Sequence, residues 1–358
     1  MDRTLPTAAP LAVLNPGGRD AMIDYGDGPG IPGSGLHPPV NFHAYAAATR
    51  GAFCDAVEQV LDGRRFGHCL VLLRRRLRPC LEAVRRLQGA GLKVWVAWKE
   101  CSPFQIAAQL EEPKLWGLYE EVLGLSDAVV TPTLGPPPLP PNLREPRFLQ
   151  IPTPYPVDLP AWDFSCAPGD RRGIFLGTRE LFTASRNHLA ALSTALRVAR
   201  RTGTHVTVIN ADKSRGRRLL DAVGRGVPAE RFRIIESRLP YPEYLRRMAA
   251  HRVVFQLDRG GVPGQVAGDA LLCRTVCVGG NSAIEQLAFP AESHPNLSDA
   301  DAASRLEALL TDETVYRAAI ESSQQRALQN LSFATVAQQV RDLQGMDGRI
   351  TDPAHDLS

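Results

Sequence analysis

The sequence lacks the features that mark several large classes of protein. It has no run of about 18 apolar residues, the length that a helix needs to span a membrane, so we expect no transmembrane segment. The formal net charge is only +3 over 358 residues, and acidic and basic residues are mixed, so no basic stripe of the kind that binds nucleic acid is present. The first residues, MDRTLPTAAPLAVL, contain an acid, prolines and a short apolar stretch, which is not the pattern of a secretory signal.

Cysteine and histidine also lack the spacings of metal sites. The 7 cysteines are scattered without a C-x-x-C pair, which predicts free thiols and a protein of the reducing cytoplasm. Cys69, Cys273 and Cys277 lie in apolar runs, where a core position is expected. There is no H-x-x-x-H pair. Residues 299–301 spell D-x-D, but Ser298 before them favours a capping box at a helix start, so we expect no required metal.

What the sequence does contain is a regular alternation of strands and helices, which predicts an α/β fold with parallel, doubly wound sheets. The length fits two domains. We expect an N-terminal Rossmann-like domain over residues 1–155 and a C-terminal one over 156–330. Residues 331–358 are expected to form a helix and tail that cross back to the first domain. The proline-rich stretch within 134–172 is expected to be the linker.

The individual elements follow from apolar runs and helical spacing. In the first half we expect strands at 11–14, 69–73, 93–98 and 128–130, and helices at 41–61, 78–89 and 115–125. In the second half we expect strands at 173–177, 206–210, 233–236, 253–255 and 275–278, and helices at 187–201, 213–225 and 241–250. The tail is expected to form helices at 299–310 and 312–343, the second broken near Ser332.

One glycine motif is rejected as a dinucleotide-binding fingerprint. Gly28, Gly30 and Gly33 spell G-x-G-x-x-G, but no strand directly precedes them and the neighbouring prolines oppose a helix there. We expect residues 26–39 to form a long mobile loop instead.

The most informative stretch follows the strand at 253–255. Gly260, Gly261 and Gly264 lie in a loop that leads to Gln265 at the start of a helix. Glycine lets backbone N–H groups approach a ligand, and a helix N-terminus is partly positive. These residues predict a diphosphate cradle, the alternative being an ordinary turn. Asp269, one turn into the helix, could accept ribose hydroxyls, or could simply complement the helix dipole.

Further candidates follow other strands. Gly177 ends the strand at 173–177, where ligands bind in α/β sheets, and Arg179 and Arg186 follow it. Both arginines could bind phosphate and stabilise a departing diphosphate, or could be solvated loop residues. Arg238 also follows a strand and could line the nucleotide base, although a solvated loop arginine is the simpler interpretation.

The first half offers fewer candidates. Gly17 and Gly18 end the first strand and either approach a ligand or form a plain turn. His43, near the start of a helix, is a candidate catalytic residue, with a surface histidine as the alternative.

Several short segments of the sequence, occurring in the same order along the chain, resemble those of a known family. Residues 151–158 (IPTPYPVD) resemble the phrase IPNGVD, and residues 174–179 (IFLGTR) resemble FVGR. Residues 242–245 and the strand after them resemble ELYRLADVFV, and residues 331–334 (LSFA) resemble FSW. These phrases are similar to those of GT-B glycosyltransferases, and specifically of the retaining, metal-independent group that uses nucleotide sugars.

This resemblance implies two Rossmann-like domains that face each other across a cleft. It implies a nucleoside-diphosphate sugar, with UDP or GDP as the nucleotide, bound on the C-terminal domain, and no other cofactor. The acceptor, which could be a sugar, a lipid-linked glycan, a natural product or a protein, would bind the N-terminal domain. Arginines and backbone N–H groups would assist departure of the diphosphate, and transfer would retain the anomeric configuration.

The chain departs from the family pattern in two places: Arg179 and Arg186 match the family's Arg…Lys pair imperfectly, with a spacing one residue off, and an acid is missing from the glycine loop. The family has Glu-x7-Glu in this loop and helix; Asp269 takes the second position and Gly261 the first. Asp258, three residues before Gly261, is a candidate replacement. Gly261 in place of the glutamate favours one alternative, a non-catalytic GT-B-like binding or scaffold protein. A nucleotide-sugar epimerase of the same fold is a second alternative.

Overall fold

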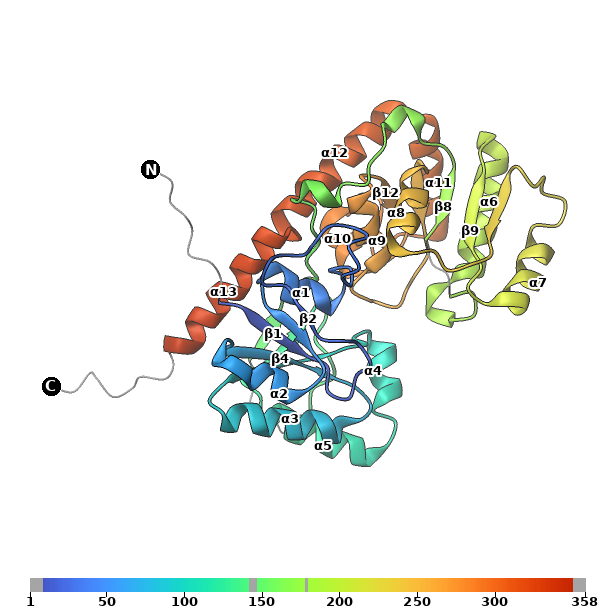
Figure 1. The fold of residues 1–358 in the computed structure, drawn as a ribbon. Coiled ribbons are helices and arrows are strands. Elements are labelled where there is room, and N and C mark those ends of the chain that lie inside the picture. The colour runs from blue at the N-terminus through green and yellow to red at the C-terminus, as the bar shows by residue number, and fades with distance from the viewer. Residues whose placement is uncertain (1–8, 142–146, 178–179, 350–358) are drawn as a thin grey trace, which may run out of the picture. The chain divides into compact units, whose positions relative to one another are not determined.

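The computed structural model describes residues 9–141, 147–177 and 180–349 and divides the chain into two compact units (Figure 1). The first unit contains Met1–Asp158 and Leu331–Ser358, and the second contains Leu159–Asn330. Each unit is built around its own, mainly parallel sheet. Among the described residues, no helix is both long enough and apolar enough to cross a membrane.

The first unit contains a seven-stranded sheet in the order β2-β3-β1-β4-β5-β6-β7, in which only β2 is antiparallel. The strands are β1 (Leu11–Leu14), β2 (Ile23–Asp24), β3 (Ala52–Cys54), β4 (His68–Leu73), β5 (Lys93–Trp98), β6 (Ala128–Thr131) and β7 (Phe148–Gln150). The helices are α1 (Phe42–Ala48), α2 (Val57–Leu61), α3 (Leu77–Gly89), α4 (Pro103–Gln109), α5 (Pro113–Leu125) and α13 (Phe333–Arg349). Because crossover helices cover a parallel sheet, the inner strands β1, β3, β4, β5 and β6 are buried along almost their whole length, whereas the edge strands β2 and β7 are partly exposed.

The predicted helix over residues 41–61 is wrong, because the chain there forms α1, then β3, then α2. Gly51 marks the change: a Cβ at this position would stand 1.9 Å from the carbonyl oxygen of Leu11, so only glycine lets the chain approach β1 this closely. Phe53 then pairs in register with Val13 of β1. The apolar residues that suggested helical periodicity are buried in either arrangement, so spacing alone did not distinguish them.

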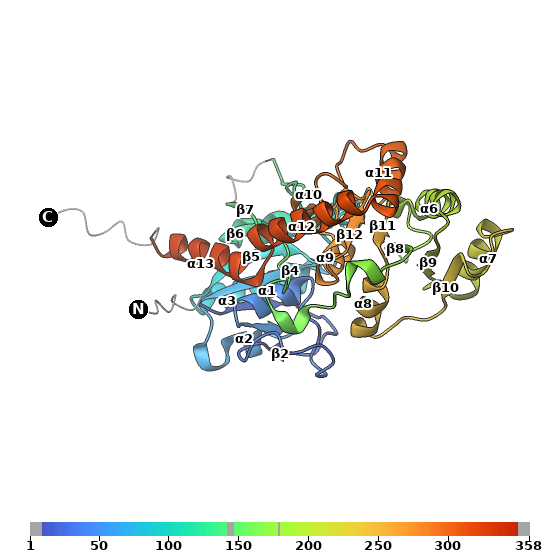
Figure 2. The same cartoon turned by 90° about the horizontal axis from the view of Figure 1, so that it is seen from above.

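The last helix belongs to the first unit. The N–H of Tyr155 donates to the carbonyl of Leu331 at 2.7 Å, and the carboxylate of Asp158 accepts from the N–H groups of Phe333 and Ala334 at 3.2 and 3.1 Å. An acid at a helix N-terminus is favourable, so Asp158 fixes the start of α13. The helix then packs against α1 (Figure 2). The predicted break near Ser332 is confirmed, since α12 (Glu313–Asn330) ends just before it.

The second unit contains a five-stranded, fully parallel sheet in the order β10-β9-β8-β11-β12. The strands are β8 (Ile174–Leu176), β9 (Val206–Ile209), β10 (Phe232–Ile235), β11 (Val253–Phe255) and β12 (Val276–Val278). Besides α12, the helices are α6 (His188–Thr202), α7 (Lys213–Val223), α8 (Tyr241–Ala249), α9 (Gln265–Leu272), α10 (Ala283–Ala288) and α11 (Asp299–Thr311). Single turns of 3-10 helix occur in both units, among them η4 (Ala184–Arg186).

The structure also bears on three smaller expectations. The predicted linker is too long, because residues 148–150 form β7 and pair with β6 inside the first sheet. The cysteine prediction is confirmed: all seven are free thiols, and Cys69, Cys273 and Cys277 are fully buried. Residues 26–39 form turns and irregular chain without a helix, as their glycines and prolines predicted.

Candidate functional site

The strand order of the second unit defines where a ligand would bind. The chain runs from β8 outward to β9 and β10, then returns to the other side of β8 as β11. In open α/β sheets, ligands bind outside the carboxyl ends of the strands where the order reverses, which here are β8 and β11. Gly177 follows β8, and Asp258 lies three residues after β11. The candidate site is therefore built from the loops that follow these two strands.

Gly177 lets a helix approach the end of β8. A Cβ at Gly177 would lie 2.5 Å from the Val266 side chain of α9 and 3.2 Å from that of Val254, so a larger residue would push the helix away. The N–H of Gly177 donates to the carbonyl of Phe255 at 2.9 Å. Gly177 thus has a packing role at the predicted site. Arg179, which follows it, lies outside the described residues.

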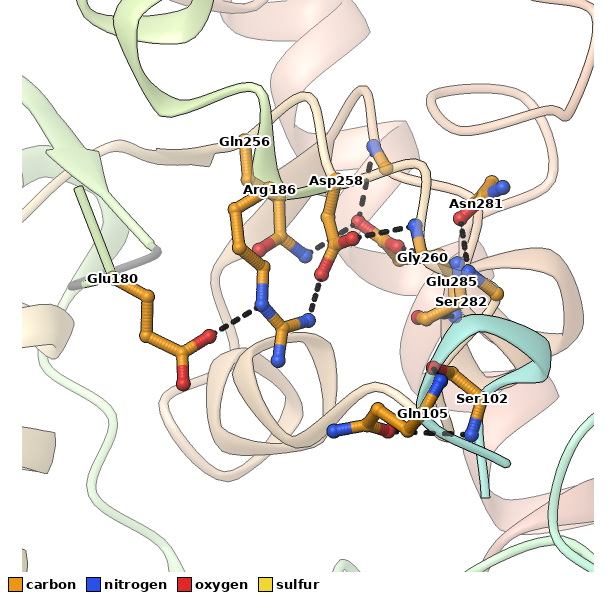
Figure 3. Close-up of polar contacts among 12 residues, drawn as sticks. Ser102, Gln105, Glu180, Arg186, Gln256, Asp258, Gly260, Asn281, Ser282 and Glu285 are labelled. Atoms are coloured by element: carbon orange, nitrogen blue, oxygen red, sulfur yellow. Dashed lines mark hydrogen bonds and ion pairs between the residues drawn. The ribbon is translucent and has the colours of Figure 1, made fainter. Parts of the chain in front are cut away.

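Arg186, at the end of η4, lies between two carboxylates (Figure 3). Its Nε donates to Glu180 at 2.5 Å, and its Nη1 forms an ion pair with Asp258. The side chains of Arg186 and Asp258 are only 19% and 4% exposed, so water screens this pair weakly. Burial acts to lower the pKa of Arg186, but the two acids overcome it and raise the pKa. The guanidinium is therefore a permanent cation at the site.

The backbone N–H groups of Gly260 and Gly261 are hydrogen-bonded within the protein. The N–H of Gly260 donates to the Asp258 carboxylate at 2.7 Å, and the N–H of Gly261 donates to the Asn281 side chain at 3.0 Å. The N–H of Asn281 in turn donates to the Asp258 carbonyl at 3.0 Å. The sequence predicted that these two glycine N–H groups face a phosphate. In the structure the Gly260 N–H closes a turn within its own loop onto Asp258 (Figure 3), and the Gly261 N–H joins the loop after β11 to the loop after β12.

Gly264 has a packing role at the start of α9. It caps α9 with a φ of 107°, a conformation that side chains rarely adopt. A Cβ there would lie 2.2 Å from the Ser282 hydroxyl, so the side chain would point into the protein. This packing requires glycine at position 264, and its predicted role beside a phosphate stays a prediction. Gln265 follows as the half-exposed first residue of α9.

A buried glutamate that the sequence analysis overlooked organises the neighbouring loop. Glu285 is fully buried and accepts hydrogen bonds from the N–H groups of Gly280 and Ser282 at 3.1 and 2.9 Å, and from the Gln256 side chain at 2.8 Å. Burial raises the pKa of Glu285. Ser282-x-x-Glu285 is a capping box at the start of α10, a pattern that could have been recognised in the sequence.

Asp269 lies inside the second unit with a partner that the sequence did not suggest. It is only 1% exposed, and the phenol of Tyr241 donates to its carboxylate at 2.5 Å. Tyr241 begins α8. A ribose that used Asp269 would therefore have to share it with Tyr241 or replace Tyr241. Arg238, in the loop before α8, is exposed.

The first unit has its own polar cluster at the carboxyl edge of its sheet. After β1, the N–H of Gly18 donates to the carbonyl of Asn15 at 2.9 Å, closing a turn in which Gly17 has a φ of 66°. The side chain of Asn15 donates to Asp20 at 2.9 Å, and Lys99, directly after β5, donates to the same carboxylate oxygen at 2.8 Å. The bond from Lys99 lowers the pKa of Asp20 against a smaller opposing effect of burial. Gly17 and Gly18 thus form the turn that the sequence left as one alternative.

His43 is a packed residue rather than a surface one. It is 6% exposed, with its ring stacked between His37 at 3.9 Å and Phe53 at 3.6 Å between centroids. Its Nδ1 lies 3.1 Å from the Tyr25 phenol. Burial, helped by His37, lowers the pKa of His43 to about 3, so its ring is neutral at pH 7 and only a weak base. The alternative of a surface histidine is wrong, and its catalytic role stays a prediction.

The residues that spell D-x-D do serve as a helix start. Ser298 accepts a hydrogen bond from the N–H of Asp301 at 3.1 Å and donates to the Asp301 carboxylate at 2.6 Å. The predicted cap of α11 is confirmed. Within the described ranges, no group of three or more histidine, cysteine, aspartate or glutamate residues could hold a metal ion.

Comparisons with known proteins relate the chain to others by fold. No protein-family model and no curated protein sequence matches the chain. The UDP-forming α,α-trehalose-phosphate synthase from Burkholderia xenovorans, in complex with glucose-6-phosphate, is 15% identical, with a TM-score of 0.56 over 77% of this chain and 72% of that chain. The sucrose-phosphate synthase from Thermosynechococcus elongatus is 11% identical, with a TM-score of 0.61 over 96% of this chain and 100% of that chain. A glycosyltransferase from Rickettsia africae is 9% identical, with a TM-score of 0.58 over 83% of this chain and 80% of that chain.

These identities are low, so the likeness is one of fold. The chain has the GT-B fold of these glycosyltransferases, which confirms the predicted pair of doubly wound α/β domains. Of the predicted site residues, the structure brings Gly177, Arg186 and the loop of Gly260 and Gly261 to the strand ends where the order reverses. Gly17, Gly18 and His43 lie in the other unit.

Proposed function

We propose that this chain is a glycosyltransferase that moves a sugar from a nucleoside-diphosphate sugar to an acceptor hydroxyl. The observation that carries the proposal is the position of Arg186. Arg186 is a permanent cation that lies at the carboxyl ends of β8 and β11, where the strand order of the second sheet reverses. The fold is shared with a synthase described as UDP-forming. The guanidinium of an arginine at this point can bind a phosphate through two parallel hydrogen bonds.

The proposed roles follow from the chemistry of the leaving group. The bond between the sugar's anomeric carbon and the diphosphate oxygen breaks, and the acceptor oxygen forms the new bond to that carbon. The acceptor's hydroxyl proton leaves to the diphosphate or to water. Arg186 and the N-terminus of α9 would stabilise the charge that develops on the diphosphate. Asp269 would hold the ribose, UDP or GDP would be the nucleotide, and neither a further cofactor nor a metal would be required.

The first unit would bind the acceptor. Lys99 and Arg74 follow neighbouring strands at the carboxyl edge of the first sheet, since the N–H of Lys99 donates to the carbonyl of Leu73 at 3.0 Å. Two cations at this edge suit an anionic acceptor such as a sugar phosphate, and one of the structurally similar synthases is described in complex with glucose-6-phosphate.

A second candidate is a nucleotide-binding protein without transferase activity. Gly261 stands where the resembling family has an acid, and the nearby Asp258 is already engaged by Arg186 and by the N–H of Gly260. No described carboxylate in this loop is then left to handle the donor sugar. No observation on the described residues specifically favours the alternative of a nucleotide-sugar epimerase.

The test begins with a thermal-shift screen of UDP, GDP, ADP, TDP and CMP and their sugars. Ligand at 100 times its dissociation constant should add roughly 2.7 kcal/mol of stability. The best donor is then incubated with candidate acceptors, including glucose 6-phosphate, with and without excess chelator, and products are followed by mass spectrometry. Proton NMR of the product gives its anomeric configuration, which we expect to be retained.

The matched control uses two arginines that flank the same helix. Arg186 precedes the first turn of α6, whereas Arg201 lies in its last turn and pairs with Glu307 at 2.5 Å. Arg186→Gln should abolish nucleotide stabilisation, and Arg201→Gln should leave it intact. Stabilisation without transfer would favour the second candidate, and the absence of any stabilisation by nucleotides would contradict both. Activity that disappears with chelator and returns with Mg²⁺ would contradict the metal-free mechanism.

A further inference from the structure

The charge around Arg186 is already compensated from within the protein. Asp258 bonds to Arg186 with one carboxylate oxygen and accepts the Gly260 N–H with the other, at 2.7 Å (Figure 3). Glu180 takes the Nε of the same guanidinium at 2.5 Å. One cation therefore faces two acids, and the summed charge of the three side chains is −1. A doubly charged phosphate group that approaches Arg186 is repelled by both of these acids.

Asp258 occupies the kind of position that a phosphate oxygen would take. A phosphate bound at a strand end accepts hydrogen bonds from arginine and from backbone N–H groups of the adjacent loop. Asp258 makes both kinds of bond, to Arg186 and to Gly260. The pair is also buried: separating it in place would leave an uncompensated charge in the protein. A diphosphate can take this position only by exchanging with the carboxylate.

We propose that Asp258 is an internal competitor of the diphosphate and thereby a specificity-determining residue of the site. Binding then requires Arg186 to exchange its carboxylate partner for a phosphate one. Bare diphosphate binds weakly, and a donor must contribute additional contacts through its nucleoside and sugar to drive the exchange. The inference rests on the proposed function only in that it places a diphosphate beside Arg186.

The chain offers a variant that removes the charge and keeps the shape. Asparagine at position 258 has the same size, and its side-chain oxygen can still accept from the N–H of Gly260, because asparagine forms the same short turn as aspartate. Asp258→Ser is a second variant, since serine forms the equivalent turn more weakly. Glu180→Gln is the matched control, because it removes the second acid that is paired with Arg186. The side chain of Glu180 is 52% exposed.

The experiment measures binding of magnesium-free inorganic pyrophosphate by calorimetry. We expect Asp258→Asn to bind pyrophosphate at least about tenfold more tightly than the wild type, because it removes a like charge in direct contact with the binding cation. Glu180→Gln should change the affinity less than about threefold, because solvent screens an exposed charge. The effect of Asp258→Asn should persist in about 1 M salt, where charges more than about 3 Å apart are screened. Arg186→Gln should remove the binding.

Every outcome of this experiment either supports or overturns the proposed competition between Asp258 and the diphosphate. A folded Asp258→Asn variant whose affinity for pyrophosphate is unchanged or weaker overturns the inference. If Asp258→Asn does not fold, Asp258→Ser must show the tightening, and failure of both to fold would make Asp258 a structural residue and overturn it as well. Pyrophosphate carries neither base nor sugar, so tighter binding can be observed even in a chain that transfers nothing. Conversely, sugar transfer by a chain whose Asp258→Asn variant shows no tightening contradicts only this inference.

Discussion

The carboxyl edges of the two sheets carry ion pairs that differ in how far they are buried. In the first unit, Lys99 and Asp20 form a pair whose side chains are 28% and 37% exposed. In the second, Arg186 and Asp258 form a pair whose side chains are 19% and 4% exposed. Ion pairs that solvent reaches contribute roughly 0.2–1 kcal/mol, whereas removal of one partner from a buried pair costs about 3–5 kcal/mol, so the more accessible Lys99–Asp20 pair should separate at the lower cost.

The difference shows that a shared topology fixes the position of a site but not its readiness for a ligand. Parallel strands end at the same edge in both units, so polar residues gather there in both. At the first edge, Lys99 can leave Asp20 for an anionic ligand at small cost. At the second, Arg186 can meet a phosphate only by exchange with a buried acid. The predictions below test this comparison, beginning with the largest expected effect.

The glycines of the two edges should differ in their contribution to stability. Gly264→Ala combines a φ of 107° with a Cβ placed 2.2 Å from the Ser282 hydroxyl, so we expect a loss of roughly 2–4 kcal/mol in the second unit. Gly17→Ala, at a φ of 66° with no atom within 4 Å of the added Cβ, should cost about 1–2 kcal/mol. Urea unfolding combined with hydrogen exchange on peptides of each unit measures both. Equal losses would show that the contact with Ser282 is unimportant.

Asp269 and its partner Tyr241 can be separated by two conservative variants. If Asp269 holds the ribose, Asp269→Asn should lose a charged hydrogen bond worth roughly 1.5–3 kcal/mol, which is about a tenfold to hundredfold loss of UDP affinity. Tyr241→Phe removes only the internal donor that Asp269 uses at 2.5 Å, so UDP affinity should stay the same or rise. Calorimetry with UDP tests both. Unchanged affinity in a folded Asp269→Asn variant would leave Asp269 as a residue of the helix interior.

The two ends of β5 provide a matched pair of lysines in the first unit. Lys99→Met, at the carboxyl end, should raise the KM for glucose 6-phosphate about tenfold, which corresponds to about 1.4 kcal/mol, and leave UDP affinity unchanged. Lys93→Met, at the amino end, removes a similar pair with Asp127 at 3.2 Å and should leave KM unchanged. Steady-state kinetics with glucose 6-phosphate as trial acceptor measures the difference. A similar rise in both variants would contradict an acceptor site at the carboxyl edge.

Acid should weaken both units through their buried histidines. Burial lowers the pKa of His43 to about 3 in the first unit, and of His188 and His251 to about 4 in the second. Between these values and the unfolded value of about 6.5, the unfolded chain binds more protons, so stability falls as the pH drops through this window. With two such histidines, the second unit should lose more.

The variant that checks this prediction is His43→Phe. It should reduce the pH dependence of the first unit by about one proton, or about 1.4 kcal/mol for each pH unit between about pH 4 and 6, and leave that of the second unit unchanged. Hydrogen exchange followed separately on the peptides of each unit between pH 4 and 7 measures the two slopes. An unchanged slope in the first unit would mean that His43 takes up its proton without unfolding.

Much of the fold was determined by local sequence. Apolar runs of strand length, alternating with helical spacing, specified a parallel α/β chain, and β1, β5 and β9 lie where those runs predicted. Local turn and cap chemistry was equally informative: Ser298 caps α11 as its hydroxyl predicted. These features depend on residues only a few positions apart, so the sequence contains their cause directly.

Other features of the fold required the tertiary structure. Residues 52–54 form β3 because they pair with β1, about forty residues away, although their spacing also fits a helix. The last helix joins the first unit because Leu331 bonds to Tyr155 and because Asp158 caps α13. Such pairings are decided by which surfaces meet in the folded chain, which local propensity does not encode.

The features of the candidate site also separate into those that local sequence determined and those that the tertiary structure decided. By itself, the sequence determined that glycines, arginines and acids gather in the loops after β8 and β11, because turn chemistry and strand ends are local properties. Only the tertiary structure decided how their charges are paired: Asp258 with Arg186, 72 residues apart, and Asp269 with Tyr241, 28 residues apart. Ion pairs and hydrogen bonds depend on distances of a few ångströms between side chains, and the packing of the helices and loops around the second sheet sets these distances.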